Sequence, residues 1–153
     1  KMAVEASSKV SLPLVIVGGV LSKNEKKYLN TTLRNNYILL SGISNKELNL
    51  LYNNAFCFLY PTTYEGFGIP LLEAQRAGCP VISSNISSIP EVAGKGAVLI
   101  DDINSDKISE VLNGMKTNDN EKLSLVELGL KNSQSFSWEK CYIATKNIYE
   151  NIL

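Results

Sequence analysis

Two glutamates, Glu65 and Glu73, flank a glycine-containing loop and have seven residues between them. Glycine lets backbone N–H groups approach a ligand closely, and the N-terminus of a helix favours phosphate. Carboxylates add acceptors for hydrogen bonds from hydroxyl groups. These residue types, in this order, predict a site that holds a sugar linked to phosphate.

Pro70 indicates how the two carboxylates are divided between parts of such a ligand. Proline suits the first position of a helix, because the N–H that it lacks would have no partner there, so the free N–H groups of the next two residues can point at a diphosphate. Glu73, one turn into the helix, is placed to accept hydrogen bonds from a ribose diol. Glu65 and the N–H groups of Phe67 and Gly68 are placed to face a hexose.

Short apolar runs that alternate with helical patterns must position this loop. The first run, at residues 12–17, is nearly unbroken and predicts a strand that is buried on both faces. In the last helical pattern, Trp138, Tyr142, Thr145 and Tyr149 recur at helical spacing, which predicts a stripe packed into the core. Strands are predicted at 12–17, 37–40, 56–60, 80–83 and 97–100, and helices or helical turns at 24–34, 44–55, 70–77, 90–93, 105–115, 118–131 and 137–152.

This alternation predicts an α/β fold: a Rossmann-like open parallel sheet with helices on both faces and right-handed crossovers. Ligands of such sheets bind beyond the carboxyl ends of the strands. Four loops are therefore expected to share one edge, at 18–19, 41–43, 65–68 and 84–88. The chain starts within a helical pattern, at residues 2–6, without a cap or a preceding strand, so we expect it to be a piece of a longer protein.

The composition excludes several classes of function. The 153 residues suit one domain, and they contain no histidine, which removes every catalytic scheme within this chain that depends on imidazole. Fifteen basic and fifteen acidic side chains cancel, so no nucleic-acid partner is expected. The three cysteines stand among apolar residues, which indicates buried free thiols. No signal peptide is evident, and we expect a cytoplasmic protein.

The blocks around the two glutamates resemble a known family. The segment from Glu65 to Ala74, followed by the blocks at 78–82 and 88–94, is similar to the family 4 retaining glycosyltransferases. The resemblance runs from about residue 14 to residue 139, and it is closest to bacterial mannosyl- and hexosyltransferases that build O-antigen or capsular polysaccharide. It implies the GT-B fold, of which residues 1–153 would be the C-terminal donor-binding domain, without the N-terminal acceptor domain.

Carried over to the matching positions, the resemblance implies one catalytic residue, Glu65, beside the donor sugar. It further implies that Glu73 binds the ribose, that residues 69–72 contact the diphosphate and that residues 42–43 border the base. The complete set of donor-binding residues that it implies is Gly18, Gly19, Gly42, Ile43, Thr63, Gly66, Phe67, Gly68, Ile69, Pro70, Leu71, Leu72 and Glu73.

The resemblance also implies a mechanism that needs no side-chain base. In the front-face mechanism proposed for this family, the leaving phosphate takes the proton of the acceptor, and catalysis consists of positioning and charge stabilisation. The sequence holds no Asp-x-Asp motif, so neither a metal nor another cofactor is expected. The basic pair with which the family neutralises the diphosphate is not identified in this sequence. We therefore expect this chain alone to bind nucleotide weakly and to transfer no sugar.

The expected partners are a nucleotide-diphosphate hexose, GDP-mannose or UDP-hexose, and a glycan or lipid-linked acceptor that binds through the missing domain. A non-catalytic module that binds nucleotide or sugar is the alternative. A dinucleotide-dependent oxidoreductase is less favoured, because Gly18-Gly19 is not part of a Gly-x-Gly-x-x-Gly motif. The basic residues around the helix at 24–34 indicate a solvated face or, as the alternative, peripheral contact at the inner face of the membrane.

Overall fold

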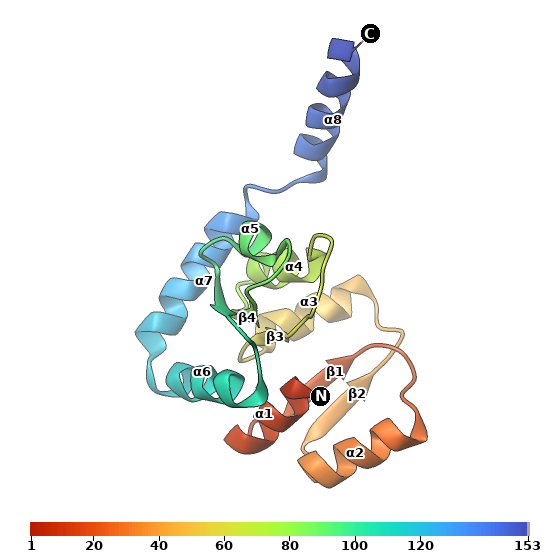
Figure 1. The fold of residues 1–153 in the computed structure, drawn as a ribbon, viewed down its shortest axis with the longest axis vertical. Coiled ribbons are helices and arrows are strands. Elements are labelled where there is room, and N and C mark those ends of the chain that lie inside the picture. Colours follow the sequence, from red (N-terminus) through yellow and green to blue (C-terminus); the bar gives the residue numbers. More distant parts are fainter. Residues whose placement is uncertain (153) are drawn as a thin grey trace.

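In the computed structural model, which describes residues 1–152, strands and helices alternate up to β5 and helices alone follow (Figure 1). Each predicted strand and helix is confirmed to within a residue or two. In chain order the elements are α1 (Met2–Val10), β1 (Leu14–Val17), α2 (Lys23–Leu33), β2 (Tyr37–Leu40), α3 (Asn45–Asn54), β3 (Phe58–Tyr60), α4 (Ile69–Arg76), β4 (Val81–Ser84), α5 (Ile89–Ala93), β5 (Ala97–Ile100), α6 (Ser105–Thr117), α7 (Asp119–Ser133) and α8 (Trp138–Ile152).

All the strands are parallel, as predicted for this α/β fold, but they form two sheets instead of one continuous sheet. β1 pairs with β2, and β4 lies between β3 and β5. The prediction that the first strand is buried on both faces is wrong. Leu14 and Ile16 pack beside α1 and α2, whereas Val15 and Val17 are 43% and 42% exposed, because helices of the described chain cover only one face of this pair.

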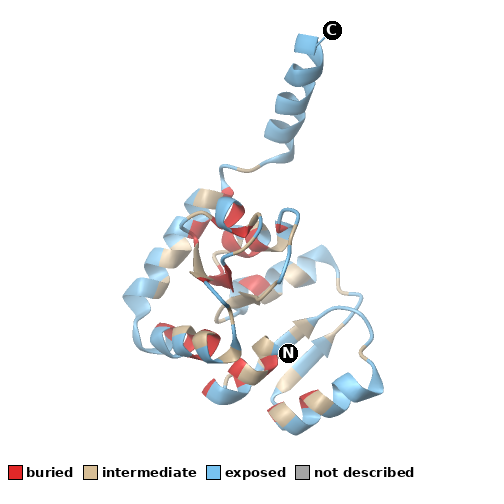
Figure 2. Cartoon of the chain, viewed as in Figure 1, coloured by how far each residue is buried: buried red, intermediate tan, exposed pale blue. Residues whose placement is uncertain are grey.

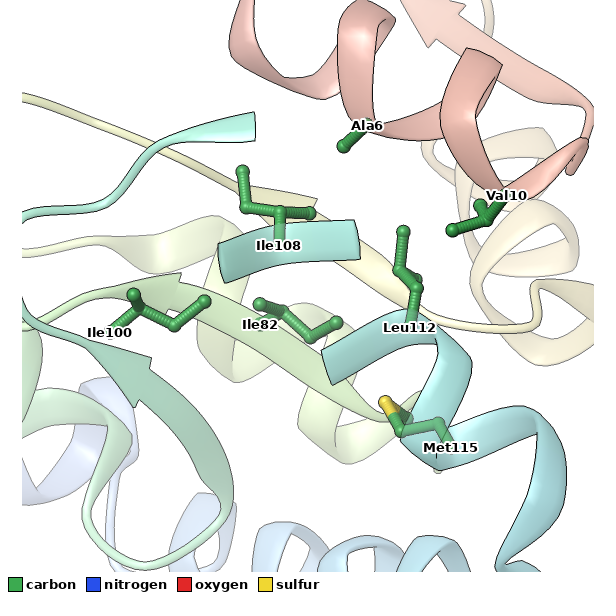
Figure 3. Packing of buried hydrophobic residues seen from close by; sticks show 7 residues of the cluster. All are labelled: Ala6, Val10, Ile82, Ile100, Ile108, Leu112 and Met115. Carbon is green, nitrogen blue, oxygen red and sulfur yellow. The ribbon is translucent and has the colours of Figure 1, made fainter. Parts of the chain in front are cut away.

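The three-stranded sheet has helices on both faces, as the sequence predicts. Ile82 of β4 packs on one side with Ala6 of α1 and Ile108 of α6 (Figure 3). Its neighbour Val81 packs on the other side with Leu71 of α4 and with residues of α5. Successive residues of a strand point to opposite faces, so β4, which is buried at every residue, serves both halves of the core.

Helix α1 connects the two sheets. Val4 packs with Leu29 and Leu33 of α2 beside the first sheet. Ala6 and Val10, on another face of the same helix, pack against α6 and the second sheet (Figure 3). The separate sheets are therefore linked through apolar residues of a shared helix and not through strand hydrogen bonds.

Capping boxes set the starts of α2 and α3. The Ser22 hydroxyl accepts from the Glu25 N–H at 3.3 Å, and the Glu25 carboxylate accepts from the Ser22 N–H at 2.8 Å. This reciprocal pair makes Ser22 the cap of α2. Ser44 caps α3 in the same way.

Helix α8 extends away from the rest of the chain (Figure 1), and all its residues are exposed (Figure 2). The prediction that its apolar stripe packs into the core is therefore wrong: Trp138, Tyr142 and Tyr149 are 80%, 66% and 67% exposed. The stripe has helical spacing, but no other element of the described chain lies beside it. Within residues 1–152, none of the helices combines the length and the apolar character that a membrane span requires.

Candidate functional site

The loop between β3 and α4 carries Glu65, and the local sequence sets its ends. Pro61 follows directly on β3 and cannot donate to a sheet ladder. Gly68 is the N-cap of α4 at a φ of +100°, a conformation that favours glycine. Its carbonyl accepts from the N–H of Leu71 at 3.0 Å. The prediction that the Leu71 N–H is free to point at a phosphate is therefore wrong.

Serine hydroxyls of β4 and the segment after it hold the backbone of this loop. Ser83 and Ser84 donate to carbonyls at the end of β3 and at the start of the loop, at 2.8 and 2.7 Å. Ser87 and Ser88 donate to the carbonyl of Glu65, at 2.6 and 3.0 Å. The segments 65–68 and 84–88 therefore meet, as predicted.

The carboxylate of Glu65 is held through one of its two oxygens. Oε1 accepts a hydrogen bond from the hydroxyl of Tyr60 and lies 3.5 Å from the hydroxyl of Thr62. Burial, followed by the hydrogen bond to Glu65, raises the pKa of Tyr60 to about 12, so this hydroxyl remains a donor at neutral pH. Within residues 1–152, Oε2 accepts no hydrogen bond, and it is available to a hydroxyl of a ligand.

The rest of the loop leaves backbone donors next to this carboxylate. The N–H groups of Phe67 and Gly68 donate no hydrogen bond within residues 1–152. The ring of Phe67, 45% exposed, packs edge-on against Phe136 at 5.9 Å between centroids. Thr63 and Gly66 are exposed. The loop therefore holds one carboxylate oxygen and two N–H groups without a partner in the described chain, although Gly68 itself is buried.

Glu73 is exposed on α4 and lines a cavity of about 200 Å³ between α3 and α4. Asn45, Leu48, Asn49 and Tyr52 of α3 line the opposite side. Tyr52 is buried, and burial, followed by the negative charge of Glu73, raises the pKa of its hydroxyl. The sequence did not predict Tyr52 and Tyr60 as site residues. The signal that could have indicated them is an aromatic side chain with a polar end close to the motif.

The glycines after β1 lie elsewhere. Gly18 and Gly19 line a second hollow of about 200 Å³ at the carboxyl ends of β1 and β2, with Lys26 and Ser41. The two hollows share no lining residue. The prediction of a single edge shared by four loops is therefore not met, because β1 and β2 belong to the other sheet.

Two further predicted residues lie between these hollows in the sequence. Gly42, at a φ of +65°, and Ile43 connect β2 to the cap of α3. Neither lines either hollow. Within residues 1–152, no group of three or more His, Cys, Asp or Glu side chains is arranged to hold a metal ion.

Known proteins match this chain over most of its length. The family model described as "Glycosyl transferases group 1" matches residues 2–145. The chain belongs to this family. The O-antigen chain mannosyltransferase B of Escherichia coli is 38% identical over 111 residues, which are 72% of this chain and 29% of that relative. This group 1 glycosyltransferase chain thus spans less than a third of the length of that relative.

Solved structures share the fold of this group 1 glycosyltransferase chain. Sucrose-phosphate synthase from Thermosynechococcus elongatus matches with a TM-score of 0.83 at 19% identity, over 99% of this chain and 42% of that one. Anabaena Alr3699/HepE in complex with UDP matches with a TM-score of 0.81 at 18% identity, over 99% of this chain and 44% of that one. The resemblance to the family 4 glycosyltransferases and the GT-B fold is confirmed, and the chain corresponds to their C-terminal part.

Proposed function

We propose that residues 1–153 form the donor-binding domain of a retaining, metal-independent hexosyltransferase. The observation that carries this proposal is the arrangement around Glu65. One oxygen of its carboxylate is held by Tyr60, while the other oxygen and the N–H groups of Phe67 and Gly68 remain without a partner in the described chain. This pattern of one acceptor and two donors suits the hydroxyl groups of a hexose.

The start of α4 extends the proposed site toward the diphosphate. The positive end of a helix stabilises phosphate, although the hydrogen bond from Leu71 to Gly68 leaves fewer free donors than the sequence predicts. Glu73, one turn further along α4, then accepts hydrogen bonds from the ribose hydroxyls. Catalysis in this proposal consists of positioning and of charge stabilisation, and the leaving phosphate takes the proton of the acceptor.

The donor is proposed to be a nucleotide-diphosphate hexose. A curated relative is named as an O-antigen chain mannosyltransferase, which favours GDP-mannose, and HepE was solved with UDP, which supports a UDP-hexose as the alternative. The acceptor is proposed to be a glycan or a lipid-linked glycan of a bacterial surface polysaccharide, bound by a separate N-terminal domain at the inner face of the membrane. Residues 1–153 alone are proposed to bind nucleotide and to transfer no sugar.

Calorimetry on the full-length protein tests this proposal. UDP, GDP and ADP are titrated into the parent protein, into Glu73→Gln and into Glu91→Gln, where Glu91 is an exposed carboxylate at the start of α5. A hydrogen bond to a charged group contributes about 1.5–3 kcal/mol, so Glu73→Gln is expected to weaken the preferred nucleotide by about tenfold or more. Glu91→Gln is expected to bind like the parent.

Two results would overturn the proposal. If the parent binds none of the three nucleotides, the chain is not a donor-binding domain. If Glu73→Gln binds every nucleotide as well as the parent does, the ribose role of Glu73 is wrong. The anomeric configuration of the product, read by NMR after transfer by the full-length protein, tests the retaining mechanism separately.

A further inference from the structure

Three aromatic rings, one from α3 and two from one face of β3, contact one another in a row near the two carboxylates of the motif. The rings of Tyr52 and Phe58 meet edge to face, with centroids 5.2 Å apart and planes at 81°. The rings of Phe58 and Tyr60 stack, with centroids 5.5 Å apart and planes at 26°. Phe58 and Tyr60 are two residues apart on a strand, so their side chains lie on the same face. We call this set the aromatic row.

One end of the aromatic row is hydrogen-bonded to Glu65, and the other end shares a cavity with Glu73. The hydroxyl of Tyr60 donates to Oε1 of Glu65. At the other end, Tyr52 and Glu73 line the same cavity between α3 and α4. The carboxylates are separated along the chain by the exposed glycine loop, but the row connects them through packed rings that do not depend on that loop.

We propose that Tyr60 and Tyr52 are positioning residues, which hold the carboxylates of Glu65 and Glu73 at a fixed separation so that one donor molecule meets both. This inference rests on the proposed function, because it assigns the carboxylates to the two ends of one nucleotide sugar. Tyr60 directs the orientation of Glu65 by occupying Oε1 and leaving Oε2 for the sugar. Tyr52 directs Glu73 toward the ribose.

Burial supports this assignment over simple packing. Phenylalanine at either position would fill the same space without the cost of removing a hydroxyl from water. Tyr52 is only 8% exposed, and the pKa of its hydroxyl is raised by burial and by the charge of Glu73. Both hydroxyls therefore stay protonated at neutral pH and can donate to a carboxylate. Phe58, between them, supplies packing alone.

The chain offers a matched control outside the site. The hydroxyl of Tyr28, on α2, donates to Oε1 of Glu5, on α1, at 3.0 Å. Tyr28→Phe therefore removes a hydrogen bond of the same chemistry without touching α3, β3 or α4. If the hydroxyl groups of the row only stabilise the fold, all three Tyr→Phe variants should behave alike.

The test uses Tyr60→Phe, Tyr52→Phe and Tyr28→Phe in the full-length protein. Nucleotide affinity is measured by calorimetry, kcat and KM by transfer from the donor sugar, and stability by urea unfolding. We expect Tyr60→Phe to lower kcat by about tenfold while the affinity for the free nucleotide stays unchanged, because Glu65 faces the sugar. We expect Tyr52→Phe to weaken nucleotide binding by about tenfold, and Tyr28→Phe to change neither property.

A double-mutant cycle keeps the role of Tyr60 testable even if the single variants are less stable than the parent. Glu65→Gln removes the charge that Tyr60 holds, so adding Tyr60→Phe to Glu65→Gln is expected to lower kcat no further. If the parent binds nucleotide and all three Tyr→Phe variants match it in kcat and in nucleotide affinity, the positioning role is overturned. The proposed function would still stand in that case. Full additivity in the cycle overturns the role of Tyr60. A parent that binds no nucleotide overturns both proposals.

Discussion

Glu65 depends on groups from several segments of the chain. Tyr60, at the end of β3, donates to its carboxylate, and Ser87 and Ser88, after β4, donate to its carbonyl. A glutamate in an exposed glycine loop would otherwise sample many orientations, and the entropy lost on fixing it would oppose ligand binding. Because Tyr60 and the two serines already fix Glu65 in the folded protein, less conformational entropy would be lost when a ligand binds.

Gly68, in the same loop, is a position at which the backbone conformation favours glycine. Its φ of +100° is strained for other residues, and an added Cβ would lie 3.1 Å from side-chain atoms of both Ile89 and Leu71. We expect Gly68→Ala to lower the free energy of unfolding by about 1–2 kcal/mol, measured by urea denaturation. Gly66→Ala is the control, because its Cβ would meet nothing within 4 Å. Equal losses in the two variants would contradict this account.

At the scale of elements, a buried polar network holds α4, the helix that carries Glu73. Gln75 is 1% exposed, and its Nε2 donates to the carbonyl of Ala93, at the end of α5, at 2.9 Å. Its Oε1 accepts from the Nδ2 of Asn132, on α7, at 2.8 Å. Arg76, the next residue, donates to the carbonyl of Ser133 at the end of α7 and to a carbonyl in the segment after it. The position of Glu73 therefore depends on helices far along the sequence.

Gln75→Met is expected to weaken this arrangement. The substitution keeps the length of the side chain but removes both hydrogen bonds of the Gln75 amide, which costs about 1–3 kcal/mol of stability. The Asn132 amide keeps the Val92 carbonyl as a partner, and the Ala93 carbonyl keeps the N–H of Gly96. The measurement is the shift of the urea midpoint at constant m-value. Gln134→Met, at an exposed position after α7, is the control and is expected to leave the midpoint unchanged. A midpoint unaffected by Gln75→Met would show that the network adds no stability.

For the molecule as a whole, the described residues form a packed body and a projecting helix. Two sheets share α1, and α8 lies apart from them (Figure 1). The cysteines report on this division: Cys79 is buried, Cys57 is partly buried, and Cys141, on α8, is exposed. The prediction of three buried thiols is therefore wrong for Cys141, for the same reason that the apolar stripe of α8 is exposed.

Alkylation of the chain of residues 1–153 tests this description. Burial raises the pKa of Cys57 to about 12 and that of Cys79 to about 11, so neither forms the reactive thiolate at pH 8 or 9. We expect iodoacetamide to modify only Cys141 in the folded chain and all three thiols in urea, read by intact mass. A thiol has a lower pKa in the unfolded chain than in its buried position. Raising the pH above the pKa of the unfolded thiols should therefore also favour unfolding. Protection of Cys141 would mean that α8 is covered.

The order of the elements and the identity of the motif were predictable from the sequence. Apolar runs and the block from Glu65 to Glu73 act over a few neighbouring residues, and the elements that they predict appear in the structure where they were expected. The family assignment rests on the same local blocks. Helical spacing likewise predicted that α8 is a helix, although it could not say whether another element would cover it.

Tertiary structure alone decided which groups meet. Tyr60 holds Glu65, Ser88 reaches the loop from 23 residues away, and the hollow at Gly18 lies apart from Glu73 because the strands divide into two sheets. The physical reason is that a strand or helix forms through contacts a few residues apart, whereas burial and side-chain hydrogen bonds depend on segments that the chain brings together only when it folds. The sequence thus predicted the glutamates of the candidate site, and the fold determined which of their atoms have partners within the described chain.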